Sequence, residues 1–148
     1  MNTGKRVRLN RVFAHPSGRL CSVAVDHFIA YDAGLPPGLR HMGKTLEALV
    51  AGGPDAVTMH RGIAAACWQP FAGRVPLIMQ SSMIRADDTA MTQSATPEDA
   101  VRLGADAIAV VGFMRGPTEA HYLRVISESV REAARYEMPV ICHIYPRT

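Results

Sequence analysis

The sequence predicts an α/β fold in which parallel strands alternate with helices, as part of a (β/α)8 barrel. Five apolar segments rich in β-branched residues recur along the chain, and most of them stop at polar or ionisable residues. Buried parallel strands have this composition, and their carboxyl ends form the functional rim of α/β folds. No Gly-rich phosphate-binding motif follows the first segment, which disfavours a dinucleotide-binding sheet. The segments are 20–27, 56–62, 75–82, 107–113 and 139–147.

Helical patterns separate these segments. The longest runs over 118–136, and we expect its apolar face to carry Leu123, Ile126, Val130 and Ala133 or Ala134. A helix over 39–50 and a short one over 63–68 are also predicted, whereas 81–95 is expected to be a long polar rim loop. Thr96 is a typical N-cap, followed by Pro97 and acidic residues, and Gly104 is the expected C-terminal glycine of that helix.

Length and composition favour one soluble domain. The 148 residues are 48% hydrophobic and 20% charged, enough for a sizeable core. We treat 1–148 as one incomplete barrel domain that begins with a polar, turn-rich segment over 1–19. The net charge of +3 is small and its basic residues are scattered, so nucleic acid is not an expected partner.

Targeting signals and paired cysteines are not recognisable in the sequence. The start lacks the apolar run of a leader, and no segment approaches the ~20 apolar residues of a membrane span. The three cysteines have no metal-type spacing. Cys21 and Cys142 lie inside predicted strands, so we expect small buried thiols and a reducing, cytoplasmic location.

An ordered set of motifs resembles the DeoC/LacD aldolase family, and within it the archaeal-type class I fructose-bisphosphate aldolases and their autoinducer-processing relatives. The motifs are Val25-Asp-His27, His60-Arg-Gly-Ile-Ala64, Val75-Pro-Leu-Ile78, the run 96–106 and the run 138–147. The resemblance implies a (β/α)8 TIM barrel that forms a Schiff base between a lysine on strand six and a ketose phosphate. It places this chain on strands one to five.

The resemblance also implies roles for residues at the strand ends. Asp26 matches the aspartate that hydrogen-bonds around the carbinolamine and iminium, and Tyr145 matches the proton-transfer tyrosine. We expect His27, His143, Arg147 and Ser81 to contact the substrate, with no cofactor and no metal. Strand alternation predicts that His27 points away from Asp26, whereas His143 shares a face with Tyr145.

Three departures from the family pattern bear on activity. Phe28 stands where the family commonly has Gly, and His143 stands where it often has Trp. The chain has only two lysines, Lys5 and Lys44, and neither matches the nucleophile. The expected activity is that of a Schiff-base lyase on a phosphorylated ketose such as fructose 1,6-bisphosphate, carried by a fragment that is inactive alone.

Two alternatives stay open at this point. Asp26, His60 and His143 end three strands, and a carboxylate with two imidazoles could hold a divalent cation in a metal-dependent lyase or isomerase. The chain could instead be a non-catalytic aldolase-like module. A five-stranded piece exposes two sheet edges, so we also expect it to need further strands or another copy of itself, as a homo-oligomer.

Overall fold

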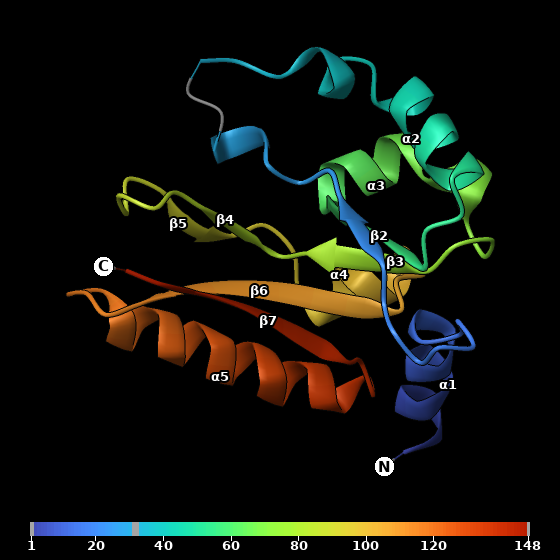
Figure 1. Ribbon diagram of the computed structural model, residues 1–148. Helices are drawn as coiled ribbons and strands as arrows, with labels where there is room; N and C mark the ends of the chain where they lie inside the picture. The colour runs from blue at the N-terminus through green and yellow to red at the C-terminus, as the bar shows by residue number, and fades with distance from the viewer. Residues whose placement is uncertain (1, 31–32, 148) are drawn as a thin grey trace.

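The computed structural model describes residues 2–30 and 33–147, and its centre is a five-stranded sheet curled into half of a barrel (Figure 1). The strand order is β1-β2-β3-β6-β7, and every neighbouring pair is parallel. The carboxyl ends of all five strands therefore meet at one rim, and the predicted fold class is confirmed. The strands are β1 (Ser22–Ala24), β2 (Ala56–His60), β3 (Leu77–Gln80), β6 (Ala107–Met114) and β7 (Val140–Pro146).

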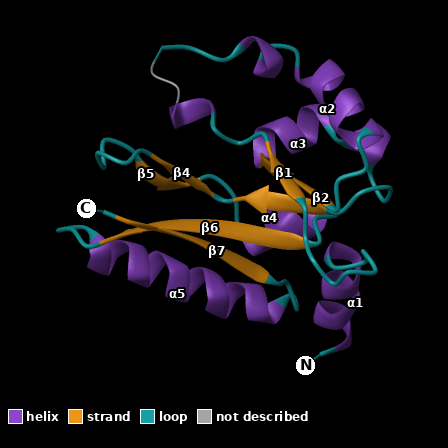
Figure 2. Cartoon of the chain, viewed as in Figure 1, coloured by secondary structure: helices purple, strands orange, loops and turns teal. Residues whose placement is uncertain are grey.

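Helices connect the strands and cover the outer face of the sheet (Figure 2). They are α2 (Met42–Ala51), α3 (Arg61–Cys67), α4 (Pro97–Arg102) and α5 (Glu119–Arg135), with short 3₁₀ turns η1 (Phe28–Ala30), η2 (Pro37–Leu39) and η3 (Gln69–Phe71). The predicted helix starting at Leu39 divides into η2 and α2. No helix in the described ranges is long and apolar enough to cross a bilayer.

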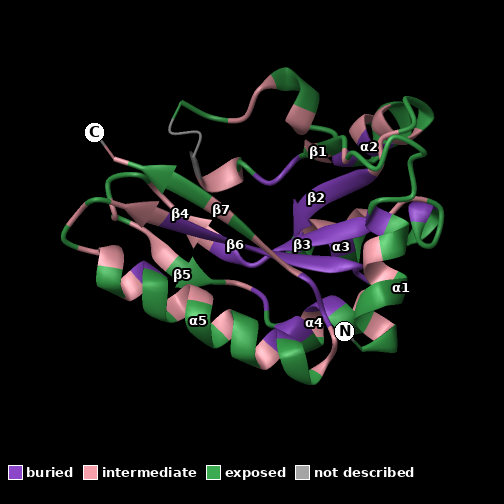
Figure 3. Ribbon diagram, turned by 60° about the horizontal axis from the view of Figure 1, so that its bottom comes forward, coloured by how far each residue is buried: buried purple, intermediate pink, exposed green. Residues whose placement is uncertain are grey.

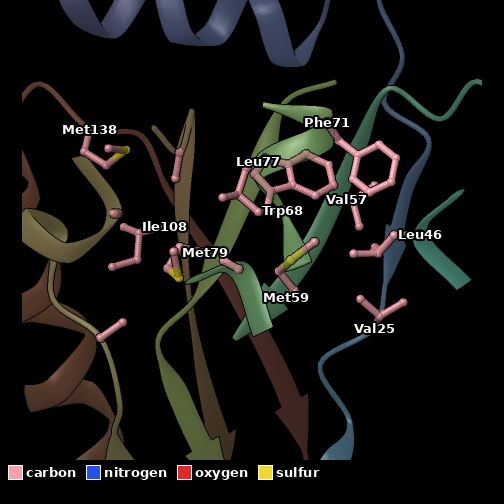
Figure 4. Packing of buried hydrophobic residues seen from close by; sticks show 14 of the residues in the cluster. Val25, Leu46, Val57, Met59, Trp68, Phe71, Leu77, Met79, Ile108 and Met138 are labelled. Carbon is pink, nitrogen blue, oxygen red and sulfur yellow. The ribbon is translucent and has the colours of Figure 1, made fainter. Parts of the chain in front are cut away.

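The core lies between the sheet and this helical layer (Figure 4). Alternate residues of the central strands, including Met59 and Met79, pack there against Leu46 of α2 and Trp68. The residues between them face the hollow of the half-barrel, where small side chains dominate; a second cluster there consists of Ala56, Ile78, Ala107 and Ala109. Strand alternation thus separates an outer packing face from an inner face.

The start of α4 follows the sequence prediction. Thr96 Oγ1 accepts a hydrogen bond from the Asp99 backbone N–H (3.2 Å), and Asp99 Oδ2 accepts one from the Thr96 backbone N–H (3.0 Å). This reciprocal pair is a capping box with Pro97 at the first helical position. Gly104 ends the turn at φ +71°, as a C-terminal glycine should.

The longest helix is confirmed, but its predicted apolar face is partly wrong. Leu123 and Val130 are 50% and 46% exposed, whereas Tyr122 and Ala133 are buried. Gly112 of β6 sets this rotation, because a Cβ there would lie only 3.0 Å from Ile126 Cδ1. The missing side chain lets α5 lie close against β6 with Tyr122 and Ile126 facing the strand.

The amino-terminal segment differs from the expectation of a turn-rich stretch. Residues Thr3–Val12 form the helix α1, which packs against the amino end of the half-barrel (Figure 1). Val12 is only 1% exposed, and Arg11 Nη1 lies 3.2 Å from Asp106 Oδ1. The burial of Val12 and the ion pair with Asp106 stabilise this helix. The polar local sequence shows neither contact, so the helix was not predicted.

The expected rim loop over 81–95 is also wrong, because this segment contains a β-hairpin. Its strands are β4 (Ser82–Ile84) and β5 (Met91–Gln93), paired antiparallel. In the turn that joins the two strands, Arg85 Nε donates a hydrogen bond to the Ile29 carbonyl oxygen (3.0 Å). Asp87 and Asp88, which are typical turn residues, were a signal for the turn of this hairpin.

Asp88 anchors the far end of the hairpin, in a cluster that we call the Asp88 clamp. Its carboxylate accepts hydrogen bonds from Thr118 Oγ1 and Tyr122 Oη, both at 2.8 Å, and pairs with the Arg147 guanidinium at 2.5 Å. The bond from Arg147, despite opposition from desolvation, lowers the pKa of Asp88 to about 2. Desolvation and the Asp88 carboxylate raise the pKa of Tyr122 to about 12.

The two edge strands are the most open part of the sheet (Figure 3). On β7, Ile144 and Tyr145 are 46% and 49% exposed. Cys21 and Cys142 are exposed rather than buried. That prediction failed because both residues belong to edge segments, which lack a strand neighbour on one side.

Core packing predicts different losses of stability when two leucines are replaced by alanine. Leu46 is fully buried on α2 and Leu123 is half exposed on α5. Leu46→Ala should lower the free energy of unfolding by about 2–5 kcal/mol, because it removes buried methyl groups and leaves a cavity. The matched control Leu123→Ala should change it by less than about 0.5 kcal/mol. Urea denaturation followed by circular dichroism measures both, and equal costs would contradict the assigned core.

The Asp88 clamp predicts a pH-dependent loss of stability in acid. The pKa of Asp88 falls from its usual 3.8 to about 2, so its stabilisation is complete above the usual value and is lost as pH drops toward 2. Asp88→Asn keeps a residue that tolerates the positive φ of 62°. The melting-temperature gap between wild type and this variant should stay constant near neutral pH and narrow below about pH 4. The exposed Glu128→Gln variant is the control, and a gap that does not narrow would argue against the clamp.

Candidate functional site

A cavity of about 400 Å³ opens at the rim where the strands end. It is bounded by residues that follow β1, by the inward-facing ends of β2, β3, β6 and β7, and by the hairpin strand β4. The inner face is therefore apolar and small near the amino ends and polar at this rim. The lining residues are Ala24, Asp26, His27, Ile29, His60, Gln80, Ser82, Ile84, Val111, Phe113, His143 and Tyr145.

Asp26 is the most buried carboxylate of the cavity, at 9% exposure. Its Oδ2 accepts a hydrogen bond from Gln80 Nε2 at 3.0 Å. Its Oδ1 lies 3.3 Å from His27 Nδ1, yet accepts no hydrogen bond from the described residues. One carboxylate oxygen is thus held by Gln80, and the other is buried beside His27 without a hydrogen-bond donor among the described residues.

His27 lies beside Asp26 rather than on the opposite face. Both side chains line the cavity, and the His27 side chain is 52% exposed. The expected alternation fails because β1 ends at Ala24, so Asp26 and His27 belong to the loop that follows it. Alternation holds on β7, where His143 and Tyr145 line the cavity together and the Tyr145 ring lies 5.6 Å from that of Phe113.

Gln80 links Asp26 to the hairpin through a buried polar network. The Gln80 side-chain oxygen accepts the Ser82 backbone N–H at 3.0 Å, so its NH₂ group must be the end that faces Asp26. Ser82 Oγ in turn accepts from the Val111 backbone N–H (2.9 Å) and from Gln93 Nε2 (3.1 Å). Neither Gln80 nor Ser82 was assigned a site role from the sequence, although polar residues at the end of a buried strand were a usable signal.

Ser81 and Arg147, both expected to contact substrate, do not line the cavity. Ser81 is 1% exposed and donates to Gln93 Oε1 and the Ala109 carbonyl oxygen. Arg147 lies over the Phe113 ring, 4.9 Å from its centre, and belongs to the Asp88 clamp. Its observed contacts therefore serve the hairpin.

The lysines lie outside the cavity wall, and the candidate metal ligands do not form a cluster within the described residues. Lys5 is on α1 and Lys44 is on α2, and neither side chain is part of the cavity wall. Within the described residues, no three His, Cys, Asp or Glu side chains come together as a metal-binding group. The metal-dependent alternative, which needed Asp26, His60 and His143 in one cluster, gains no support from this arrangement.

Known proteins similar to the chain point to one enzyme family. The family model described as DeoC/LacD family aldolase matches residues 20–148. A 2-amino-3,7-dideoxy-D-threo-hept-6-ulosonate synthase of Halobacterium salinarum is 30% identical over 99% of this chain and 54% of its own length. A 2-amino-4,5-dihydroxy-6-oxo-7-(phosphonooxy)heptanoate synthase of Streptomyces griseus is 26% identical over 97% of this chain and 53% of its own length. The chain thus spans about half the length of these relatives.

Solved structures share the fold. One is an archaeal fructose-1,6-bisphosphate aldolase with its catalytic Lys covalently bound to the carbinolamine intermediate of the substrate. It superposes with a TM-score of 0.80 at 23% sequence identity, and the match covers 97% of this chain and 58% of that one. Another archaeal fructose 1,6-bisphosphate aldolase gives 0.80 at 24% identity, covering 97% and 57%. At this identity the likeness speaks for the fold alone.

The Gln80 network predicts a stability cost that an exposed glutamine does not share. Gln80→Leu leaves a buried Asp26 oxygen and the Ser82 N–H unpaired, which should cost about 1–3 kcal/mol of unfolding free energy. Gln69→Leu, at an exposed position in η3, should stay within about 0.5 kcal/mol. Chemical denaturation of both variants checks this, and a neutral Gln80→Leu would show that the network does not hold Asp26.

Proposed function

The chain belongs to the DeoC/LacD aldolase family, and we propose that it forms the five-stranded part of a Schiff-base aldolase site for a phosphorylated ketose such as fructose 1,6-bisphosphate. The observation that carries the proposal is the meeting of Asp26 and Tyr145 in one cavity. They lie 119 positions apart in the sequence and next to opposite edges of the sheet. Only a curled sheet brings two such edges to one cavity.

Each of the two residues has a role that its chemistry supports. An imine formed from a lysine and a ketone carries positive charge and acts as an electron sink for C–C cleavage. A carboxylate near a cation favours the charged form, and Oδ1 of Asp26, which accepts no hydrogen bond from the described residues, would accept one from such a group. Tyr145, whose phenol can give or take a proton, would move the hydroxyl proton during cleavage.

The nucleophile of the reaction is proposed to lie outside the lysines of this chain. Family resemblance assigns it to a lysine on strand six, and neither Lys5 nor Lys44 lines the cavity. The cavity wall also contains no Lys or Arg among its described residues. The phosphate groups of the ligand would therefore bind elsewhere, and this cavity would hold the carbonyl and hydroxyl part.

The open edge at β7 supports a second part of the proposal, concerning assembly. Ile144 and Tyr145 are exposed on this strand, and an edge strand offers unpaired backbone groups. We therefore propose that the chain works with further strands along β7 or as a homo-oligomer. Size-exclusion chromatography with light scattering distinguishes these from a monomer.

A non-catalytic, aldolase-like module is the second candidate function. The observation that favours it is the same placement of the two lysines away from the cavity. Such a module would bind the ketose phosphate without forming an imine. Binding and imine formation must therefore be measured separately.

Imine formation is tested by borohydride reduction in the presence of dihydroxyacetone phosphate, followed by intact mass measurement. For the chain as it stands we expect no mass increase, because the amine that attacks the carbonyl is missing from the cavity. An adduct on Lys44 or Lys5, located by peptide mapping and lost in the matching Lys→Arg variant, would overturn the assignment. Denatured chain treated identically controls for non-specific reduction.

Binding is tested by titrating dihydroxyacetone phosphate into ¹⁵N-labelled chain. Amide signals near Asp26 and Tyr145 should shift, and Tyr145→Phe should weaken binding by roughly 3- to 10-fold, the value of about one hydrogen bond. Tyr136→Phe, at the end of α5 and outside the cavity, is the matched control. A titration that leaves the cavity signals unchanged would contradict the proposed function.

A further inference from the structure

We propose that His60 is a binding residue of this site and accepts a hydrogen bond from a ligand hydroxyl through an unprotonated Nε2. The inference rests on the proposed function, because it concerns how a hydroxylated ligand binds in the same cavity. Family resemblance assigns no role to this side chain. The assignment comes from the hydrogen bonds around it.

The tautomer of His60 follows from its partner. Nδ1 lies 3.2 Å from the backbone carbonyl oxygen of Gln80, inside the sheet rim. A carbonyl oxygen can only accept, so Nδ1 must carry the proton of this bond. In a neutral imidazole the other nitrogen is then an acceptor.

The position of His60 makes Nε2 available to a ligand. The residue is 8% exposed and lies at the end of β2, where it lines the cavity beside Asp26, Gln80 and Ser82. Nε2 has no hydrogen-bond partner among the described residues, and it is not one of the side-chain atoms sealed from solvent without a partner. A buried imidazole in a cavity wall, with one nitrogen held by the protein and the other without a partner, can accept a hydrogen bond from a ligand.

The surrounding groups select the chemistry of that donor. Asp26 Oδ1, 3.3 Å from His27 Nδ1, is buried from solvent and accepts no hydrogen bond from the described residues. Ser82 Oγ accepts from Val111 and Gln93 and lies 3.4 Å from Gln93 Oε1, to which it donates, so its hydrogen bonds lie within the protein. The acceptor nitrogen of His60 and a cavity wall without Lys or Arg among its described residues suit a ligand hydroxyl. A phosphate, which brings only acceptors and negative charge, does not suit them.

The test uses the full chain and starts without any ligand. Long-range ¹H–¹⁵N spectra of ¹⁵N-histidine-labelled chain at neutral pH distinguish the two neutral tautomers, and we expect the Nδ1–H form for His60. Dihydroxyacetone phosphate should then shift the His60 Nε2 signal. Acetol phosphate, which is the same ketone phosphate without the free hydroxyl, and inorganic phosphate should leave it unchanged.

Variants give an independent measurement of affinity. His60→Asn can keep an N–H for the Gln80 carbonyl but has no atom at the Nε2 position. It should bind dihydroxyacetone phosphate roughly 5- to 10-fold more weakly, as expected for one lost hydrogen bond, while its affinity for acetol phosphate stays the same. His41→Asn, at an exposed position outside the cavity, should behave like wild type.

The outcomes separate this inference from the proposed function. An Nε2–H tautomer, or equal dihydroxyacetone phosphate affinity of wild type and His60→Asn, overturns the role of His60 while the site itself stands. Failure of wild type to bind dihydroxyacetone phosphate at all overturns the proposed function and the role of His60 with it. The tautomer measurement uses the wild-type chain, so it tests the role of His60 even if His60→Asn does not fold.

Discussion

The parallel pairing of five strands is the constraint on which the rest of the structure depends. It brings every strand's carboxyl end to one rim, and strand alternation then divides each strand between two environments. Met59 packs outward against the helices while its neighbour His60 faces the cavity. Curling of the same sheet lets residues beside its two edges share one cavity, so the site follows from the way the core is packed.

An uncharged amide, that of Gln80, holds the buried Asp26 carboxyl group at the rim. Asp26 is a buried carboxylate, and burying a polar group without hydrogen bonds is costly. Gln80 supplies one, and its orientation is fixed by the Ser82 backbone. Because Gln80 is uncharged, it holds Asp26 without placing an opposite charge beside the carboxyl group. The network continues to Gln93 and so ties the site to the hairpin.

The hairpin shows how contacts distant in sequence shape the cavity wall. Arg85, in the turn between β4 and β5, binds Ile29 of η1, while the Asp88 clamp attaches the same turn to α5 and to the residue after β7. Ser82 and Ile84, on its first strand, consequently stand in the cavity wall. Arg147, which a resemblance-based argument would assign to substrate, is engaged in this clamp.

The sequence by itself determined the order of elements, the parallel α/β class, the capping box at Thr96 and the presence of Asp26, His143 and Tyr145 at strand ends. These follow from local composition and from periodicity, which act over a few residues. The tertiary structure alone decided the helix α1, the rotation of α5, the side-by-side placement of Asp26 and His27, and the roles of Gln80 and Arg147. Most of these depend on a partner far away in the sequence, such as Asp106 for Arg11 or Asp88 for Arg147, and local pattern carries no information about such partners. The placement of Asp26 and His27 depends on where β1 ends.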